Sequence, residues 1–181
     1  ESDWSSDVCS SDLETEASYG VFHGDCAIIE MAAASGLPMV PTEKRNPLNT
    51  TSYGTGELIK DALDHGYRKL SIAIGGSATN DGGCGAAAAL GVEFLDAEGK
   101  AFVPVGGTLR RIAHIRTDGL LPALRQAEVI AMCDIDNPLC GESGAAAVVL
   151  SHGAVDAVDH IGSVAAQIAL GTDGGLMERL D

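Results

Sequence analysis

The feature that most constrains the fold is an apolar run that ends in a glycine-rich polar loop, followed by a helix-forming segment. Leu70–Ile74 is short and apolar without clear alternation, which is typical of a central strand buried on both faces. Gly75–Gly83 reads GGSATNDGG, and the alanine-rich Gly85–Leu90 follows it and ends at Gly91. A strand, a close turn and a short helix in this order predict an α/β protein. The 23 glycines and the 4% aromatic content agree with close packing of small residues.

Strand and helix signals alternate along the rest of the chain. Gly24-Asp25 separates two β-rich runs, Tyr19–His23 and Cys26–Met31, and predicts a hairpin. One pattern predicts a helix that Thr51 or Ser52 can cap, that has Leu58, Ile59, Ala62 and Leu63 on one face and that ends at Gly66. Further patterns predict a helical turn at 32–36, a hairpin over 92–103, a short helix at 108–112, a strand at 128–133 and a late amphipathic helix over 155–168. The predicted fold class is therefore α/β, with a mixed sheet and flanking helices.

Two of the expected strands end in polar loops. Leu70–Ile74 leads into GGSATNDGG, and Glu128–Cys133 leads into DIDNPL at Asp134–Leu139. Ligands of open α/β sheets bind beyond the carboxyl ends of strands. If the two strands are parallel, both loops lie at one edge of the sheet.

The loop Gly75–Gly83 is the strongest local signal for chemistry. Its groups can hold phosphate or carboxylate oxygens through backbone and side chains: Gly75, Gly76, Ser77, Thr79 and Asn80. Asp81 can bind Mg²⁺ or take a proton from a hydroxyl. The alternative is a tight strand-to-helix turn with Asp81 as the N-cap. The sequence pattern supports the ligand-binding loop and the structural turn equally, because the loop fits neither G-x-G-x-x-G nor the Walker A spacing.

Two further segments carry weaker signals. In DIDNPL, Asp134 and Asp136 can share a face and suit a hard cation, although Asn137-Pro138 is also a common turn dipeptide. Thr55 and Glu57 lie in TTSYGTGELI, which predicts a helix-capping segment and, less strongly, an anion site.

Charge and cysteine usage exclude several classes of partner. The chain has 11 basic and 26 acidic residues, a formal net charge of −15, so neither nucleic acid nor an anionic membrane is an expected partner. No apolar run approaches a membrane span. Five cysteines without metal or disulfide spacing predict reduced thiols and a cytoplasmic protein. A catalytic role for Cys84 or Cys133 is the minor alternative to a buried apolar role.

The first 13 residues differ from the body. Glu1–Leu13 is rich in Ser and Asp and lacks helical or strand periodicity. DWSSDVCSSDL, at Asp3–Leu13, resembles the conceptual translation of a short-read sequencing adaptor. We therefore expect an artefactual or disordered tail that makes few contacts with the body.

Several longer motifs resemble one enzyme family. They are IIEMAAASGL at Ile28–Leu37, NPLNTTSYGTGELI at Asn46–Ile59, AIGGSATNDGG at Ala73–Gly83 and CDIDNPL at Cys133–Leu139. Together they resemble the bacterial glycerate kinases of the type I family, from about Tyr19 to Val148. The resemblance implies a fragment of a two-domain α/β kinase with its site between the domains. It also implies ATP- and Mg²⁺-dependent phosphorylation of a D-glycerate hydroxyl to give phosphoglycerate.

For a partial glycerate kinase, we infer roles for the candidate residues from the chemistry of phosphoryl transfer, which is mainly positioning and charge stabilisation. The backbone of Gly75–Gly83 and the side chains in it would hold glycerate or phosphate oxygens, and Asp81 and Asp134 would bind the metal or activate the hydroxyl. Three more residues would shape the pocket: Asn137, Thr55 and Glu57.

The sequence departs from the family pattern at several places. The DS-x-K and DGGEGT motifs and the later nucleotide-associated motifs do not occur in the chain. VVLSHGAVDAVDHIGSVA stands where a GPQKGA segment is expected, and whether residues 149–172 are divergent or a sequence error stays open. We expect a tail at 1–13, a partial kinase core at 14–150 and a divergent helical segment at 151–181. The chain alone is expected to be inactive; the alternative to a kinase fragment is a non-catalytic anion-binding module.

Overall fold

The main sheet is mixed, as the sequence predicts. The computed structural model describes residues 2–7 and 14–132. Five strands lie in the order β1-β2-β3-β4-β8: β1 Ser2–Asp7, β2 Glu14–Phe22, β3 Cys26–Glu30, β4 Lys69–Ala73 and β8 Glu128–Met132. The pairs β1-β2 and β2-β3 are antiparallel, whereas β4 pairs in parallel with both β3 and β8. The expected hairpin and the expected central strand are both confirmed.

The N-terminal strand corrects one expectation. Residues 2–7 are extended, but they pair with β2 in continuous register, from Ser2 opposite Tyr19 to Asp7 opposite Glu14. The expectation that this segment makes few contacts with the body is therefore wrong for residues 2–7.

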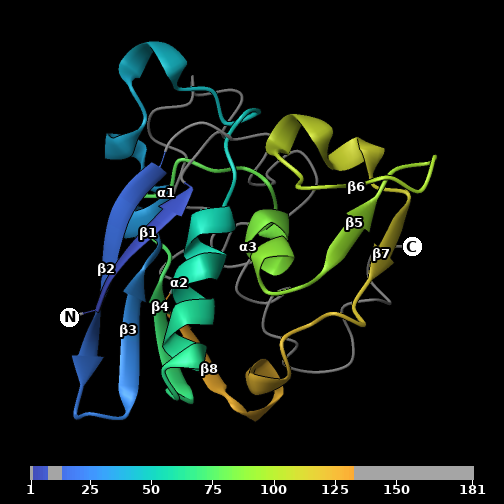
Figure 1. The fold of residues 1–181 in the computed structure, drawn as a ribbon. Coiled ribbons are helices and arrows are strands. Elements are labelled where there is room, and N and C mark those ends of the chain that lie inside the picture. Colours follow the sequence, from blue (N-terminus) through green and yellow to red (C-terminus); the bar gives the residue numbers. More distant parts are fainter. Residues whose placement is uncertain (1, 8–13, 133–181) are drawn as a thin grey trace.

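Three α-helices cover one face of the sheet or follow its strands (Figure 1): α1 Met31–Ser35, α2 Tyr53–Asp64 and α3 Cys84–Ala89. Helix α2 packs its apolar face on the sheet, where Leu58, Ala62 and Leu70 are buried in one core cluster. Gly66, just beyond α2, has a φ of 94°, which is the left-handed backbone that favours glycine at a helix end.

A second, smaller sheet lies beside α3 (Figure 1). It has the order β6-β5-β7 and consists of β5 Glu93–Leu95, β6 Ala101–Phe102 and β7 His114–Arg116. The hairpin of β5 and β6 confirms the prediction over 92–103, whereas β7 carries no clear strand signal. Its pairing with β5 places it in the sheet.

Short 3₁₀ helices fill the connections: η1 Leu37–Met39, η2 Thr42–Lys44, η3 Gly106–Arg111 and η4 Pro122–Gln126. The expected short helix at 108–112 corresponds to η3, which begins earlier and is 3₁₀ rather than α.

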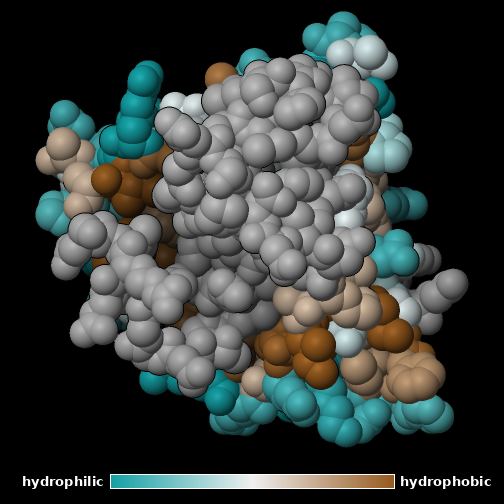
Figure 2. Space-filling model, turned by 180° about the vertical axis from the view of Figure 1, so that it is seen from behind, coloured by the Kyte–Doolittle hydropathy of each residue, from teal (hydrophilic) through white to brown (hydrophobic). Residues whose placement is uncertain are grey.

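The face of the sheet away from α2 carries exposed apolar residues. Figure 2 shows the molecule from this side, with apolar residues in brown. Phe22 on β2 and Ile130 on β8 are 55% and 54% exposed among the described residues. No described helix has the length and apolar character needed to cross a lipid bilayer.

Some expectations lie outside the described residues. They concern Asp134, Asn137 and the helical segment expected at 151–181. These remain predictions from sequence.

Candidate functional site

A ligand-binding edge shared by the two candidate loops requires that the strands before them are parallel, and the structure has this arrangement. Strands β4 and β8 are parallel, and Ala73 at the end of β4 lies opposite Met132 at the end of β8. The two strands therefore end at the same edge of the sheet, where ligands of open α/β sheets bind. The loop Gly75–Gly83 begins at this edge.

Neighbouring segments hold this loop on two sides. Gly76, with a φ of 71°, accepts a hydrogen bond through its carbonyl from the Leu37 amide at 3.0 Å. The Ala78 amide donates to the Ser35 carbonyl at 2.8 Å, and the Ala78 carbonyl accepts from the Thr50 hydroxyl at 2.7 Å. The loop is thus fixed to the end of α1 and to the segment before α2.

The hydroxyls of Ser77 and Thr79 are directed to each other. Their oxygens lie 2.8 Å apart, and the Thr79 amide donates to Ser77 Oγ at 3.0 Å. Both residues are buried, at 0% and 1% exposure. They stabilise the turn of the loop, and contact with a ligand would require part of this arrangement to open.

The rest of the loop differs from this pair in its exposure and its hydrogen bonding. Gly75 and Gly76 are exposed among the described residues. Asn80 is 9% exposed, and its side-chain amide makes no hydrogen bond within the described residues. A buried amide that has no partner among the described residues can bind a ligand oxygen or a water molecule.

Asp81 is the centre of a buried hydrogen-bond network. Its Oδ2 accepts from the Ser52 amide at 2.7 Å, the Ser52 hydroxyl at 2.8 Å and the Gly85 amide at 3.1 Å. Thr51 Oγ1 donates to the same oxygen at 3.3 Å, and Oδ1 accepts from the Gly83 amide at 3.0 Å. The burial of the carboxyl raises the pKa of Asp81, and the hydrogen bonds from Ser52, Gly83 and Gly85 oppose that shift.

These contacts favour the structural alternative that the sequence left open for Asp81. Its carboxylate caps the amides at the start of α3, and it also reaches the start of α2. Thr51 and Ser52 were expected mainly as caps of α2, in a segment with a weaker signal for an anion site. Ser52 is the N-cap residue, but its side chain bonds to Asp81 and to the Ala86 amide instead of capping its own helix. Residue spacing gives no signal for a partner 29 positions away.

Two glycines allow α2 and α3 to lie in contact at this point. A Cβ on Gly85 would lie 2.7 Å from both Asp81 Oδ2 and the Tyr53 amide. A Cβ on Gly56 would lie 2.6 Å from the Cα of Ala86. Since real Cβ atoms do not approach this closely, glycine is required at both positions.

The two α2 candidates differ in their surroundings. Thr55 is buried, and its hydroxyl lies 2.8 Å from Ser35 Oγ. Glu57, two residues later, is half-buried. The structure therefore places Thr55 next to the polar loop contacts.

Nearly all the buried polar residues gather around this loop. Ten described polar or charged residues are buried, and nine of them form what we call the polar cluster: Ser35, Thr50, Thr51, Ser52, Thr55, Ser77, Thr79, Asn80 and Asp81. Asp96, directly after β5, is the tenth. Burial of polar groups requires hydrogen-bond partners, so this concentration marks a specifically built region.

The described part of the chain provides no complete metal site. No group of three or more His, Cys, Asp or Glu side chains lies together there. Both Asp81 oxygens accept hydrogen bonds from the protein, and this arrangement does not fit a carboxylate whose oxygens are open to bind a cation. Nearby, burial raises the pKa of the Cys84 thiol to about 12, which favours the apolar role for this cysteine over a nucleophilic one.

Known proteins match this chain over most of its length. The Glycerate kinase family matches residues 7–151. This chain belongs to the glycerate kinase family. A glycerate kinase of Haemophilus influenzae is 57% identical over 125 residues, which are 69% of this chain and 33% of that protein. A glycerate 2-kinase of Escherichia coli is 49% identical over 136 residues, which are 75% of this chain and 36% of that protein.

A solved structure of a similar protein has the same fold as this family member. A crystal structure from Salmonella typhimurium LT2, assigned to glycerate kinase 2, superimposes with a TM-score of 0.80 at 39% identity. The match covers 95% of this chain and 48% of that one. The chain thus spans about a third to a half of the length of these relatives.

Proposed function

We propose that this chain carries the glycine-rich loop side of a glycerate kinase active site. The reaction is transfer of the γ-phosphate of ATP to a hydroxyl of D-glycerate, which gives phosphoglycerate. The observation that carries the proposal is the polar cluster at the carboxyl edge of parallel strands, in a chain of this family. Phosphoryl transfer depends mainly on positioning and charge stabilisation, and a fixed loop of this kind supplies positioning.

In this proposal, different parts of the loop have different tasks. The exposed backbone of Gly75 and Gly76 and the amide of Asn80 bind oxygens of glycerate or of the phosphate. Ser77 and Thr79 hold the turn between them, and Thr55 and Glu57 shape the wall toward α2. Asp134 and Asn137 enter the proposal from their sequence motif alone.

ATP and Mg²⁺ are part of the proposal because the family is a kinase family. Mg²⁺ bound to the phosphates would neutralise charge that develops during transfer. Of the two carboxylates suggested by the sequence, Asp134 is the remaining candidate ligand, because the oxygens of Asp81 already accept five hydrogen bonds. A cytoplasmic location belongs to the same proposal.

An assay of ADP release, with glycerate and Mg-ATP, tests the proposal. It is run on the gene product that contains these residues and on the 181-residue chain. We expect glycerate-dependent turnover from the gene product. Its absence would reject the kinase function and favour the anion-binding module.

The role of Asn80 is tested in the same assay. Asn80→Ala should raise the KM for glycerate by about tenfold, because a buried hydrogen bond to a charged ligand group contributes about 1.5–3 kcal/mol. Gln126→Ala removes an exposed amide in η4 and is the matched control. An unchanged KM in Asn80→Ala would remove Asn80 from the site.

A further inference from the structure

We propose that Asp81 is a positioning residue: its carboxylate joins the starts of α2 and α3 and thereby fixes the loop Gly75–Gly83, without touching substrate or metal. The catalytic part of this inference rests on the proposed function. The structural part depends only on the contacts of Asp81.

The first argument is the direction of the contacts. All five hydrogen bonds to the carboxylate come from donors of the protein, and three of these donors are backbone amides: Ser52, Gly83 and Gly85. Four of the five bonds converge on Oδ2. A cation at this oxygen would have to displace these donors or lie next to them. The arrangement therefore suits an ionised carboxylate that serves the protein itself.

The second argument is burial. Asp81 has 0% exposure among the described residues, whereas Gly75 and Gly76 of the same loop are exposed. A general base must come within about 2.6–3.2 Å of the proton that it takes. Asp81 lies behind the loop, on the side of the helices, so the ligand-facing part of the loop is separate from it.

The third argument is that the network continues beyond Asp81. Ser52 donates its hydroxyl to Asp81 and accepts the Ala86 amide at 2.9 Å, so one serine connects α2, the carboxylate and α3. Gly85 leaves room for this arrangement, since a Cβ there would collide with Asp81 and Tyr53. The connection between the two helices is thus short, and it leaves little space for rearrangement.

The consequence for catalysis follows from the chain connection. Asn80 directly precedes Asp81, and Gly83 follows it by two residues. A shift of the carboxylate moves the loop that we propose to hold glycerate. A misplacement of about 1 Å can lower the rate by about 100-fold even when no reacting group is removed.

The experiment begins with Asp81→Asn in the gene product that contains these residues. The new amide nitrogen is a donor that faces other donors, so we expect a fall in Tm of about 10 °C. We expect kcat to fall by about 10- to 100-fold. The Mg²⁺ concentration for half-maximal activity and the acidic limb of the pH profile of kcat should stay within twofold of wild type. Asp118→Asn, at an exposed position, is the matched control and should change none of these quantities.

A second pair of variants decides the matter if Asp81→Asn does not fold. Ser52→Ala and Thr51→Val remove hydroxyl donors and leave the carboxylate in place. Ser52→Ala should lower Tm by about 5 °C and reduce kcat with the same unchanged Mg²⁺ requirement, and Thr51→Val should do so more weakly.

Three results would overturn the inference. The first is a wild-type Tm in Asp81→Asn or, if that variant does not fold, in Ser52→Ala. The second is a shift of more than tenfold in the Mg²⁺ requirement, or loss of the acidic limb, in Asp81→Asn. The third is a lowered Tm with unchanged kcat, which would mean that Asp81 has a structural role only. If wild type shows no glycerate-dependent turnover, the proposed function fails, while the Tm comparisons still test the network.

Discussion

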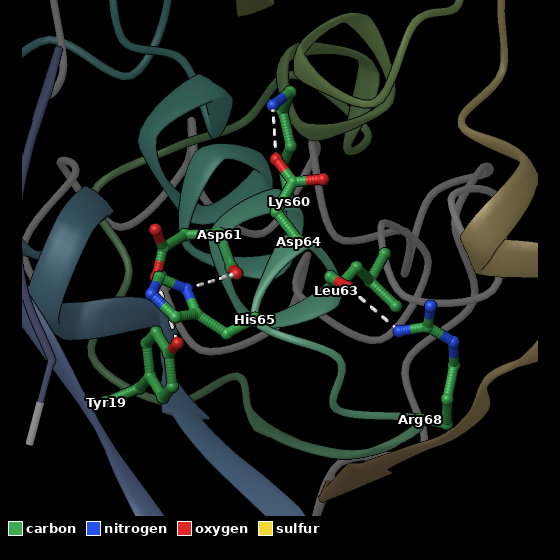
Figure 3. A network of polar contacts seen from close by, with 7 residues as sticks. All are labelled: Tyr19, Lys60, Asp61, Leu63, Asp64, His65 and Arg68. Carbon is green, nitrogen blue, oxygen red and sulfur yellow. Dashed lines mark hydrogen bonds and ion pairs between the residues drawn. The ribbon is translucent and has the colours of Figure 1, made fainter.

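The two ends of α2 use polar groups in opposite ways. At its start, Thr51 and Ser52 surround one buried carboxylate, and each of the three residues is at most 8% exposed. At its end, Lys60 and Asp64 form an ion pair at 2.6 Å with side chains that are 48% and 50% exposed. Figure 3 shows this second end, where His65 also bonds to the Asp61 carbonyl and Arg68 to the Leu63 carbonyl.

The difference shows why the number of polar contacts is a poor guide to their importance. A group that loses its partner inside the protein keeps the full cost of desolvation, about 1–3 kcal/mol or more when charged. An exposed group that loses its partner is rehydrated, so surface ion pairs contribute about 0–1 kcal/mol. Substitutions at the start of α2 should therefore cost far more than those at its end.

The largest effect is expected from Gly85→Ala. The new Cβ would come too close to Thr51, Asp81 and the Tyr53 amide, and two of these atoms belong to the network itself. The free energy of unfolding should fall by about 3 kcal/mol or more, as measured by urea denaturation. Gly20→Ala is the control, because a Cβ there meets nothing within 4 Å. Equal stability of the two variants would show that the helices can separate at no cost.

A smaller effect is expected at the other attachment of the loop. Thr50→Val leaves the buried Ala78 carbonyl without the hydroxyl that donates to it at 2.7 Å. The free energy of unfolding should fall by about 2 kcal/mol. Thr117→Val, at an exposed position, should stay within about 0.5 kcal/mol of wild type. If both valine variants behave alike, burial is not what distinguishes the two ends.

An intermediate case lies near the end of α2. The Tyr19 hydroxyl donates to Asp61 Oδ2 at 2.9 Å, and Tyr19 itself is 3% exposed (Figure 3). Tyr19→Phe keeps the ring packed and should lower the free energy of unfolding by about 1 kcal/mol. Tyr67→Phe is a suitable control, because the Tyr67 hydroxyl makes no hydrogen bond within the described residues. If the free energy of unfolding fell as much as in Thr50→Val, polar contacts at the two ends of α2 would differ less in their contribution to stability than we expect.

The smallest effect is expected from Lys60→Met. This substitution breaks the exposed ion pair with Asp64 and keeps a good helix former. Thermal unfolding should show a change below about 0.5 kcal/mol that shrinks further at high salt. Lys100→Met, at another exposed position, controls for the change in net charge. A loss above about 1 kcal/mol would mean that the pair acts in a network with Asp61.

The sequence alone determined the order and type of most elements and the position of the loop. Apolar runs gave the hairpin of β2 and β3 and the central strand β4, because local periodicity reports which residues are buried. Glycines at 24, 66 and 91 have positive φ values, so these turns were fixed by the conformational freedom of single residues. The motifs also indicated the glycerate kinase family, to which the chain belongs.

Only the tertiary structure decided what the polar residues do. Strand β7 forms by pairing with β5, and β1 pairs with β2, although neither carries a clear strand signal of its own. The sequence pattern supported a ligand role and a capping role for Asp81 equally. For Thr51 and Ser52 it predicted mainly a cap of α2. Their network joins residues 29 to 34 positions apart, and it exists because Gly56 and Gly85 let two helices touch. Local sequence cannot report such contacts, since the free energy of a buried polar group is set by partners that folding brings near.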